Sequence, residues 1–157
     1  MKKPLVSILI SSYNKGNYLE ECINSCLNQS YKNVEIILLD NFSNDKTNNI
    51  LKKYSKQITI LKKRKISKFP NLNQIDLLIK AFKMSTGSII CLLDADDFFH
   101  QNKIEKIKKL FLLKKKNDVI FDLPLIKNKN YKKKFSLKRK YQKNIWPTII
   151  PTSSISF

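Results

Sequence analysis

The stretch ICLLDADDFF, residues 90–99, joins a run of apolar residues to three closely spaced carboxylates. The chain has 157 residues and a formal net charge of +19, so acidic residues are scarce in it. A short apolar run of this kind predicts a strand that is buried on both faces, as in a parallel sheet. The sequence therefore places Asp94, Asp96 and Asp97 together at the point where a buried strand ends.

Strand and helix patterns alternate along the first two thirds of the chain. Apolar runs predict strands at 5–11, 34–40, 58–61, 88–94 and 118–126. Helical spacing of apolar residues predicts helices between them, at about 16–29, after 43, after 71 and at 102–113. The third of these helices is expected to turn its largest apolar side chains inward, namely Leu72, Ile75, Leu78, Ile79 and Phe82. This alternation indicates an α/β fold, with a mainly parallel sheet and helices on both faces.

Polar residues follow three of the predicted strands and should meet at one edge of the sheet. Ligands of parallel sheets bind beyond the carboxyl ends of the strands. The residues in question are Ser11 and Tyr13 after the first strand, Asp40 and Asn41 after the second, and Asp94, Asp96 and Asp97 after the fourth. We therefore expect a ligand site there, although Tyr13 could instead be a packed aromatic residue and Asp40 a turn cap.

Three acids at close range repel one another unless a cation lies beside them. No lysine lies between Leu92 and Gln101, so only a sequence-distant lysine could serve, and a divalent metal is the stronger candidate. Mg²⁺ and Mn²⁺ prefer oxygen ligands, and Mg²⁺ commonly binds one or two carboxylates together with substrate phosphates. Asp94 and Asp96 are two residues apart, so both point to the same side of an extended backbone. An Asp-x-Asp alone is a weak signal, but its position after a buried strand predicts a divalent ion that grips a diphosphate.

Two segments carry a family resemblance. VSILISSYNKGNYLEECINSCLNQSYKNVEIILLDNFSNDKT, followed by TGSIICLLDADD, resembles the N-terminal half of family 2 glycosyltransferases, and the similarity runs from residue 4 to about residue 110. The resemblance implies a Rossmann-like, GT-A-type fold with an incomplete acceptor part at its C-terminal end. It also implies metal-dependent, inverting transfer of a hexose from a nucleotide-diphosphate donor. The branch it resembles builds bacterial cell-surface polysaccharides and lipid-linked glycans.

The resemblance also implies roles for individual residues. Ser11 and Tyr13 would contact the nucleoside, together with Asp40 and Asn41. Asp94 and Asp96 match the DxD motif that holds the metal, Mn²⁺ or Mg²⁺, and the ribose or diphosphate of the donor. Asp97 either supports this metal site from outside its ligands or caps the loop.

The sequence departs from the family pattern at three places. Asn41 stands where the family usually has a second acid, which leaves the preference for a UDP-sugar open because an amide can both donate and accept. Leu78 and Ile79 occupy the region of a usual Arg-Asn pair. No Asp or Glu follows Asp122, so the general base of the acceptor half is not identified.

The remaining features of the sequence are its basic charge, its three cysteines and its N-terminal segment. The lysine-rich stretch 128–143 is either a solvated face or a surface for anionic membrane, while a nucleic-acid partner is not expected because the chain has only two arginines. Cys22, Cys26 and Cys91 form no zinc or disulfide pattern and are expected to be small buried residues. No signal-peptide cleavage site follows the N-terminal strand, which predicts a cytoplasmic protein, in part at the inner face of the membrane.

We interpret residues 1–157 as a single domain, with a nucleotide-sugar-binding core at 4–113 and the start of an acceptor-side region at 114–157. The first hypothesis is a glycosyltransferase that uses a nucleotide-sugar donor and a glycan or lipid-linked acceptor. The alternative is a non-catalytic or degenerate nucleotide-sugar-binding protein, or a basic module that binds membrane or nucleic acid.

Overall fold

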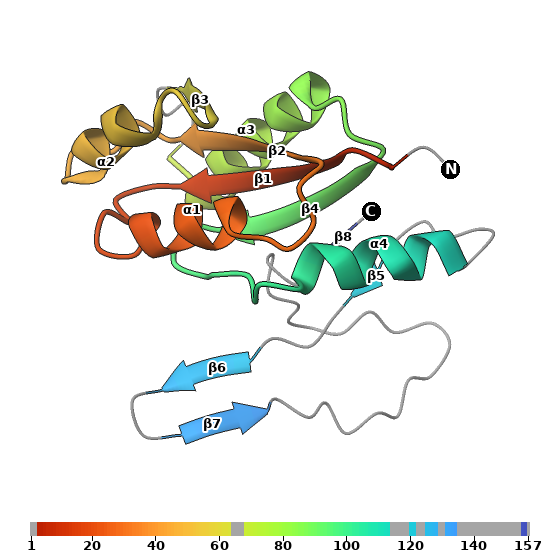
Figure 1. Cartoon of the computed structure of the whole chain (residues 1–157). Helices are drawn as coiled ribbons and strands as arrows, with labels where there is room; N and C mark the ends of the chain where they lie inside the picture. The colour runs from red at the N-terminus through yellow and green to blue at the C-terminus, as the bar shows by residue number, and fades with distance from the viewer. Residues whose placement is uncertain are drawn as a thin grey trace.

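The computed structural model describes residues 3–63 and 68–113, and beyond them only four short strands at 120–121, 125–128, 131–134 and 155–156. The described part is built around one sheet with helices on both faces (Figure 1). Most of the lysine-rich stretch lies outside the described residues, as do Asp122, the prolines at 147 and 151, and Trp146. The proposed membrane surface of the lysine-rich stretch therefore stays a prediction.

The sheet has six strands in the order β3-β2-β1-β4-β8-β5. Its four described core strands are parallel: β1 Val6–Ser12, β2 Val34–Asp40, β3 Thr59–Lys62 and β4 Ile89–Asp94. β8 Ile155–Ser156 runs antiparallel to both β4 and β5 Ile120–Phe121, and a separate hairpin joins β6 Leu125–Asn128 to β7 Tyr131–Lys134. The predicted α/β fold with a mainly parallel sheet is confirmed.

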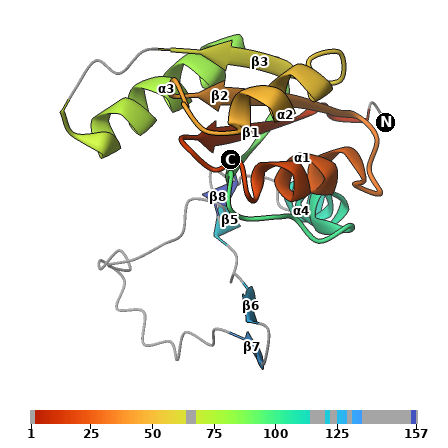
Figure 2. The ribbon, with the colours of Figure 1, turned by 90° about the vertical axis from the view of Figure 1, so that its left-hand side faces the viewer.

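Helices cover both faces of this sheet, and Figure 2 shows α3 alone on one side. The helices are α1 Leu19–Leu27, α2 Thr47–Tyr54, α3 Pro70–Met84 and α4 Lys103–Leu113. Alternation along β1 sends Val6, Ile8 and Ile10 to the core that α1, α2 and α4 cover, and Leu9 to the core under α3. The cysteines lie buried, as predicted, because they are part of the larger core.

The inward face of α3 differs from the expected one. Leu77 and Ala81 are its buried apolar residues, at 3% and 0% exposure, and they pack on the sheet between β1, β2 and β4. Of the five side chains that were expected inside, Leu78 is partly buried, but Leu72, Ile75, Ile79 and Phe82 are each about half exposed. The helix is apolar around most of its circumference, so spacing alone could not choose the face. The small Ala81 decides it, because it lets the helix approach the sheet closely.

Gln29 connects the end of α1 to the start of α4. Its side chain is fully buried, and its amide nitrogen donates to the carbonyls of Ser25 and His100, at 2.9 and 3.0 Å. Its amide oxygen accepts from the backbone N–H of Ile104 at 3.0 Å. One buried polar side chain thus bonds to three backbone groups from two elements and the loop between them.

We expect Gln29→Leu to lower the free energy of unfolding by about 2–4 kcal/mol, because leucine fills the space but removes the side-chain partner of the buried Ile104 N–H and of the Ser25 carbonyl, while the His100 carbonyl keeps its bond from the Lys103 N–H. Urea unfolding of the two proteins measures the difference. Gln57→Leu is the matched control, because Gln57 is exposed. A loss at Gln29 no larger than the loss at Gln57 would show that water replaces the amide.

Glu35 gathers hydrogen bonds where the chain approaches β4. Its Oε1 accepts from the Ser7 hydroxyl at 2.5 Å and from the backbone N–H groups of Thr86 and Gly87, at 2.6 and 2.9 Å. Burial alone would raise the pKa of Glu35, but these hydrogen bonds outweigh it and lower the pKa below the usual value.

A lowered pKa in the folded state means that the carboxylate of Glu35 stabilises the fold above the pKa of the unfolded chain. This contribution is lost as the pH falls through the lower, folded value. We expect Glu35→Gln to cost about 1–2 kcal/mol of unfolding free energy near neutral pH and almost nothing near pH ~3. Urea unfolding of both proteins at the two pH values tests this, and a difference that does not change with pH would contradict it.

Candidate functional site

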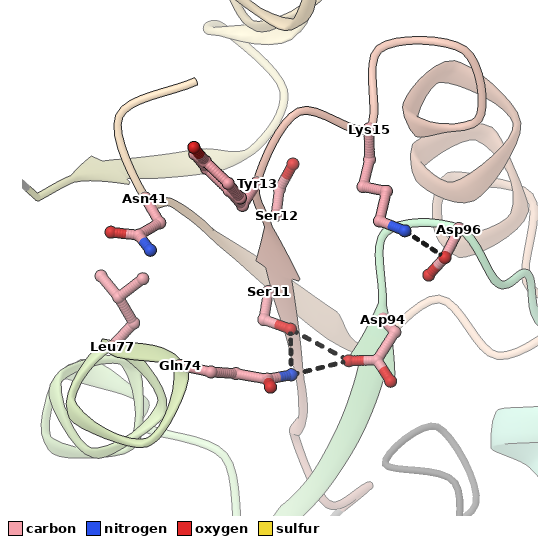
Figure 3. A pocket seen from close by; sticks show the side chains of 9 residues that line it. All are labelled: Ser11, Ser12, Tyr13, Lys15, Asn41, Gln74, Leu77, Asp94 and Asp96. Atoms are coloured by element: carbon pink, nitrogen blue, oxygen red, sulfur yellow. Dashed lines mark hydrogen bonds and ion pairs between the residues drawn. The ribbon is translucent and has the colours of Figure 1, made fainter. Parts of the chain in front are cut away.

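A cavity of about 280 Å³ opens at the carboxyl ends of β1, β2 and β4. Nine residues line it: Ser11, Ser12, Tyr13, Lys15, Asn41, Gln74, Leu77, Asp94 and Asp96 (Figure 3). The parallel register explains this meeting, because Ser12 pairs with Asp40 across β1 and β2, and Ser11 pairs with Asp94 across β1 and β4. Five of the seven residues predicted for the site therefore lie around one cavity.

Asp94 is held by neighbours from two other elements. Its Oδ1 accepts hydrogen bonds from the Ser11 hydroxyl at 3.0 Å and from the Gln74 amide at 3.1 Å. The same Gln74 nitrogen also lies 3.1 Å from the Ser11 hydroxyl, so the three side chains form a closed triangle (Figure 3). These bonds fix the orientation of the Asp94 carboxylate beside the cavity.

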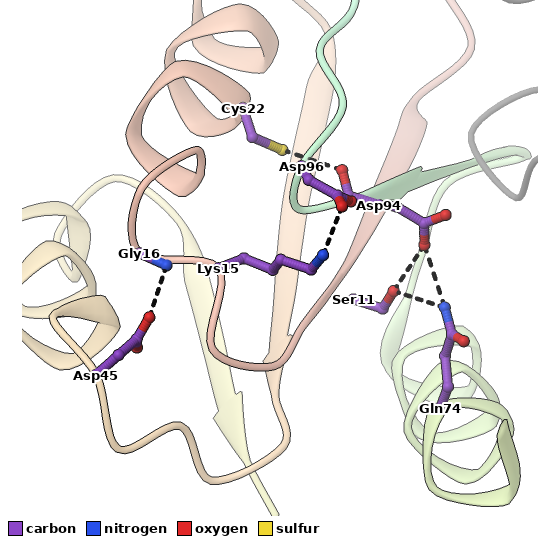
Figure 4. Close-up of polar contacts among 8 residues, drawn as sticks. All are labelled: Ser11, Lys15, Gly16, Cys22, Asp45, Gln74, Asp94 and Asp96. Atoms are coloured by element: carbon purple, nitrogen blue, oxygen red, sulfur yellow. Dashed lines mark hydrogen bonds and ion pairs between the residues drawn. The ribbon is translucent and has the colours of Figure 1, made fainter. Parts of the chain in front are cut away.

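Asp96 has a different partner. Lys15 Nζ lies 2.5 Å from Asp96 Oδ2, with both side chains about two-fifths exposed. The hydrogen bond that Lys15 donates to Asp96 raises the pKa of Lys15 above its usual value, and partial burial opposes it. Figure 4 shows the Lys15 side chain extended toward this carboxylate. The cation that the acidic stretch requires is, in this structure, a lysine from the loop after β1.

The backbone of the acidic stretch is not extended, and that expectation was wrong. Residues 95 and 96 form a turn, which the Asp97 N–H closes on the Asp94 carbonyl at 2.9 Å. Asp94 therefore points toward Gln74 and Asp96 toward Lys15, in place of two parallel side chains (Figure 4). Both carboxylates still border the same cavity.

Tyr13 and Asn41 form the other side of the cavity. Tyr13 is 41% exposed, so its ring is open to a ligand, whereas Asn41 is nearly buried. Their two loops are tied together, because the Asn41 N–H donates to the Ser12 carbonyl at 2.9 Å and the Asn14 N–H donates to the Ser43 hydroxyl at 2.8 Å. A tyrosine at this position can stack on a nucleobase.

The close contact between these loops requires glycine at position 16. The Gly16 N–H donates to Asp45 Oδ2 at 2.9 Å (Figure 4), and a Cβ at Gly16 would lie 2.5 Å from Lys46 Cγ and 2.9 Å from the Thr47 nitrogen. The loop that carries Tyr13 and Lys15 can therefore lie close against the start of α2 only with glycine at this position.

Asp40 and Asp97 are the predicted site residues that do not line the cavity. Asp40 is fully buried, and its carboxylate accepts from the Ser43 hydroxyl at 2.5 Å and the Ser43 N–H at 3.1 Å. This geometry is that of a turn cap, which holds the loop of Asn41. Asp97 is exposed and follows the turn. Contact of either residue with a nucleotide or metal stays a prediction.

The donor set suits a hard divalent ion that shares its coordination with a substrate. The described residues contain no group of three or more His, Cys, Asp or Glu side chains that could enclose a metal by themselves. Asp94 and Asp96 supply two carboxylates at one cavity, which is the usual protein contribution to a magnesium site that also takes phosphate oxygens. These two residues therefore fit an ion that arrives with a diphosphate.

Sequence reasoning missed four of the nine lining residues, Ser12, Lys15, Gln74 and Leu77. Two of these, Lys15 and Gln74, bind the carboxylates of Asp96 and Asp94. Lys15 is one of many lysines, and nothing in its local pattern sets it apart. Gln74 stands three residues before Leu77 and seven before Ala81, so it shares their inward face. That signal was hidden because the larger apolar residues at 72, 75, 79 and 82 suggested another face.

The parallel sheet with a polar cavity at its carboxyl edge defines an α/β protein of the GT-A type. The model of the family described as Glycosyl transferase family 2 matches residues 7–155, nearly the whole sequence. The chain therefore belongs to glycosyl transferase family 2.

Individual relatives agree with this assignment. An uncharacterized glycosyltransferase of Haemophilus influenzae is 38% identical over 112 residues, which cover 68% of this chain and 42% of that protein. Two solved structures share the fold. TarS of S. aureus in complex with UDP-GlcNAc has a TM-score of 0.58 at 21% identity and covers 69% of this chain and 31% of its own. The mannosyltransferase PcManGT of Pyrobaculum calidifontis, in complex with GDP-Man and Mn²⁺, has a TM-score of 0.53 at 20% identity and covers 64% and 30%.

The chain thus spans less than half the length of these relatives. The residues that the family model matches, 7–155, include all nine that line the cavity described above. None of the helices in the described part of the chain combines the length and the apolar character that a membrane span requires.

Proposed function

We propose that this chain is the donor-binding part of a glycosyltransferase that moves a sugar from a nucleotide-diphosphate donor, a UDP-sugar, to a glycan or lipid-linked acceptor with inversion. The observation that carries the proposal is the single cavity at the carboxyl edge of the sheet, where an exposed aromatic ring, an amide and two carboxylates converge. Solved structures with this fold include complexes with UDP-GlcNAc and with GDP-Man and Mn²⁺. The proposal places the enzyme in the cytoplasm.

The residues divide between the two ends of the donor. Tyr13 stacks on the base and Asn41 contacts its edge, while Ser11 and Gln74 keep the Asp94 carboxylate turned to the ribose or diphosphate. Asp94 and Asp96 are the residues that would hold Mn²⁺ or Mg²⁺. When bound, such an ion offsets the charge that develops on the departing diphosphate.

Lys15 supplies positive charge to the same place. It neutralises Asp96, which makes two neighbouring carboxylates tolerable beside the cavity. A diphosphate bound in this cavity would offer Lys15 a second anion, so the lysine would pair with a phosphate oxygen in place of Asp96.

Calorimetry with UDP, with and without Mn²⁺, tests the proposal. We expect binding that depends on Mn²⁺ and that weakens about tenfold in Tyr13→Ala, since stacking of a base on an aromatic ring contributes about 1–3 kcal/mol. Tyr18→Ala is the matched control, because Tyr18 is also exposed but does not line the cavity. Binding that does not depend on Mn²⁺ and that falls steeply with salt would indicate non-specific binding of the nucleotide to a basic surface.

Lys15→Met tests whether the lysine competes with the metal. We expect the variant to bind Mn²⁺ up to about fivefold more tightly in the absence of nucleotide, because an exposed ion pair contributes at most ~1 kcal/mol that the metal no longer has to displace. Titration followed by the electron paramagnetic resonance of free Mn²⁺ measures this. Lys53→Met, which breaks an ion pair with Glu20 outside the cavity, should change nothing. Weaker Mn²⁺ binding in Lys15→Met would refute the competition.

A nucleotide-sugar-binding protein without transferase activity is the second candidate. It is favoured by one observation: the two carboxylates that line the cavity are both assigned to donor and metal, and no third Asp or Glu is among the described residues that line it. Donor hydrolysis or transfer by the purified chain, measured as release of UDP from UDP-GlcNAc, decides between them. Binding without UDP release would favour this candidate.

A further inference from the structure

The outward face of α3 carries an apolar surface that faces solvent. Five large apolar side chains on the helix and its N-terminal flank are each 50–68% exposed: Phe69, Leu72, Ile75, Ile79 and Phe82. We call this set the α3 outer face. It holds five of the thirteen exposed large apolar residues in the described part of the chain. Such a gathering marks an interaction surface, whereas single exposed apolar residues need no explanation.

The spacing shows that this surface is one continuous stripe. Leu72, Ile75 and Ile79 are three and four residues apart, which puts them in a row along one side of the helix. Leu77 and Ala81 lie on the opposite side, against the sheet. No described element lies beyond α3 on its outer side (Figure 2).

Positive charge accompanies the stripe. Lys83 stands four residues after Ile79, and Lys80 stands eight residues after Leu72, so both lie next to the apolar row, and both are exposed. Lys68 is exposed just before the helix. The acid of this helix, Asp76, forms an ion pair with Lys63. An apolar row with lysines at its edge is the composition of a helix that lies in a membrane interface.

The net charge of the chain distinguishes between two partners that could cover the α3 outer face, a second copy of the chain and an anionic membrane. A second copy would bring another net charge of +19 against it, and the two copies would repel each other. An anionic bilayer offers the opposite charge to the lysines and an apolar layer to the stripe. We propose that the α3 outer face docks the protein on anionic lipid membranes.

Docking through the α3 outer face adds a membrane location to the proposed function, and its purpose rests on that function. Gln74 and Leu77 line the donor cavity from the inner side of α3. Docking of the outer side would leave the cavity about one helix diameter, ~10 Å, from the lipid surface. An acceptor that is anchored in lipid would then meet the donor at the membrane.

Co-sedimentation with vesicles tests the docking. We expect the chain to bind vesicles of phosphatidylcholine with ~30% phosphatidylglycerol, to lose this binding at high salt, and to bind pure phosphatidylcholine weakly. Leu72→Ser/Ile79→Ser should weaken binding at least about tenfold, because both side chains leave the interface. Leu112→Ser/Leu113→Ser is the matched control on α4, where both residues are also exposed, and it should bind as the unmodified chain does.

A second pair of variants tests whether binding depends on the lysines of α3 or on positive charge anywhere on the protein. Lys80→Gln/Lys83→Gln should weaken binding about 30-fold, whereas Lys52→Gln/Lys56→Gln, which removes two exposed lysines at α2, should weaken it only slightly. Equal losses in the two pairs would overturn the proposal. So would a concentration-dependent dimer, seen by sedimentation velocity, that Leu72→Ser/Ile79→Ser abolishes. Titration with UDP and Mn²⁺ should be unchanged in all four variants, so failure of docking and failure of donor binding are distinguishable.

Discussion

Asp96→Ala is expected to abolish the part of UDP binding that depends on Mn²⁺. The alanine removes a carboxylate from the cavity at the place where metal and diphosphate would meet. Loss of residues that merely support a metal ligand costs 10–100-fold, so loss of a ligand should cost about 100-fold or more. Calorimetric titration with UDP at fixed Mn²⁺ measures the effect, and residual binding should no longer respond to the metal.

Two other acids make this experiment specific. Glu105→Ala removes the same charge from α4, outside the cavity, and should leave UDP binding unchanged. Asp97→Ala distinguishes the two interpretations of that residue, since a supporting role at the metal predicts a 10–100-fold loss and a loop role predicts none. Mn²⁺-dependent binding that survives in Asp96→Ala would contradict the assignment of Asp96.

Gly87→Ala is expected to destabilise the fold by about 3 kcal/mol or more. A Cβ at this position would lie 2.3 Å from the Ser7 hydroxyl, 2.7 Å from the Ser7 nitrogen and 2.9 Å from the Leu5 carbonyl. Two of these three atoms belong to the backbone of the β1 region, so they cannot rotate away. Overpacking of an interior costs 1–3 kcal/mol, and displacement of Gly87 also disturbs its bonds to Ser7 and Glu35.

Urea unfolding followed by circular dichroism measures this loss. The matched control is Ser88→Ala, one residue along the chain, whose side chain is exposed and which should change stability little. A Gly87→Ala variant as stable as the control would contradict this prediction. It would mean that the segment before β4 can move away from β1, so that close packing of Gly87 on Ser7 is not needed for the fold.

The architecture was predictable because its signals are strong. Continuous apolar runs such as the one that ends at Asp94 are typical of strands covered on both faces, and β1, β2 and β4 lie within a residue or two of their expected places. The rule that ligands bind beyond the carboxyl ends of parallel strands then brought Ser11, Tyr13, Asn41 and Asp94 to one cavity. Both inferences depend only on local pattern and on topology.

The details of the site depend on contacts between distant segments, and these were not predictable. The pairing of Lys15 with Asp96 joins residues 81 positions apart, and that of Gln74 with Ser11 joins residues 63 apart. The turn after Asp94 was missed because a strand pattern does not show where pairing stops. The predicted inward face of α3 was wrong for a related reason. The burial of its residues depends on how closely the small Ala81 lets the helix approach the sheet, whereas side-chain size alone favoured residues that are exposed.

The most direct test of the central claim, that this cavity is a nucleotide-diphosphate donor site, is a crystal structure with UDP and Mn²⁺. The account predicts an anomalous scattering peak for Mn²⁺ between the Asp94 and Asp96 carboxylates and the diphosphate, with the uracil against Tyr13 and Asn41. A nucleotide bound at another face of the sheet, or Mn²⁺ bound away from both carboxylates, would contradict it.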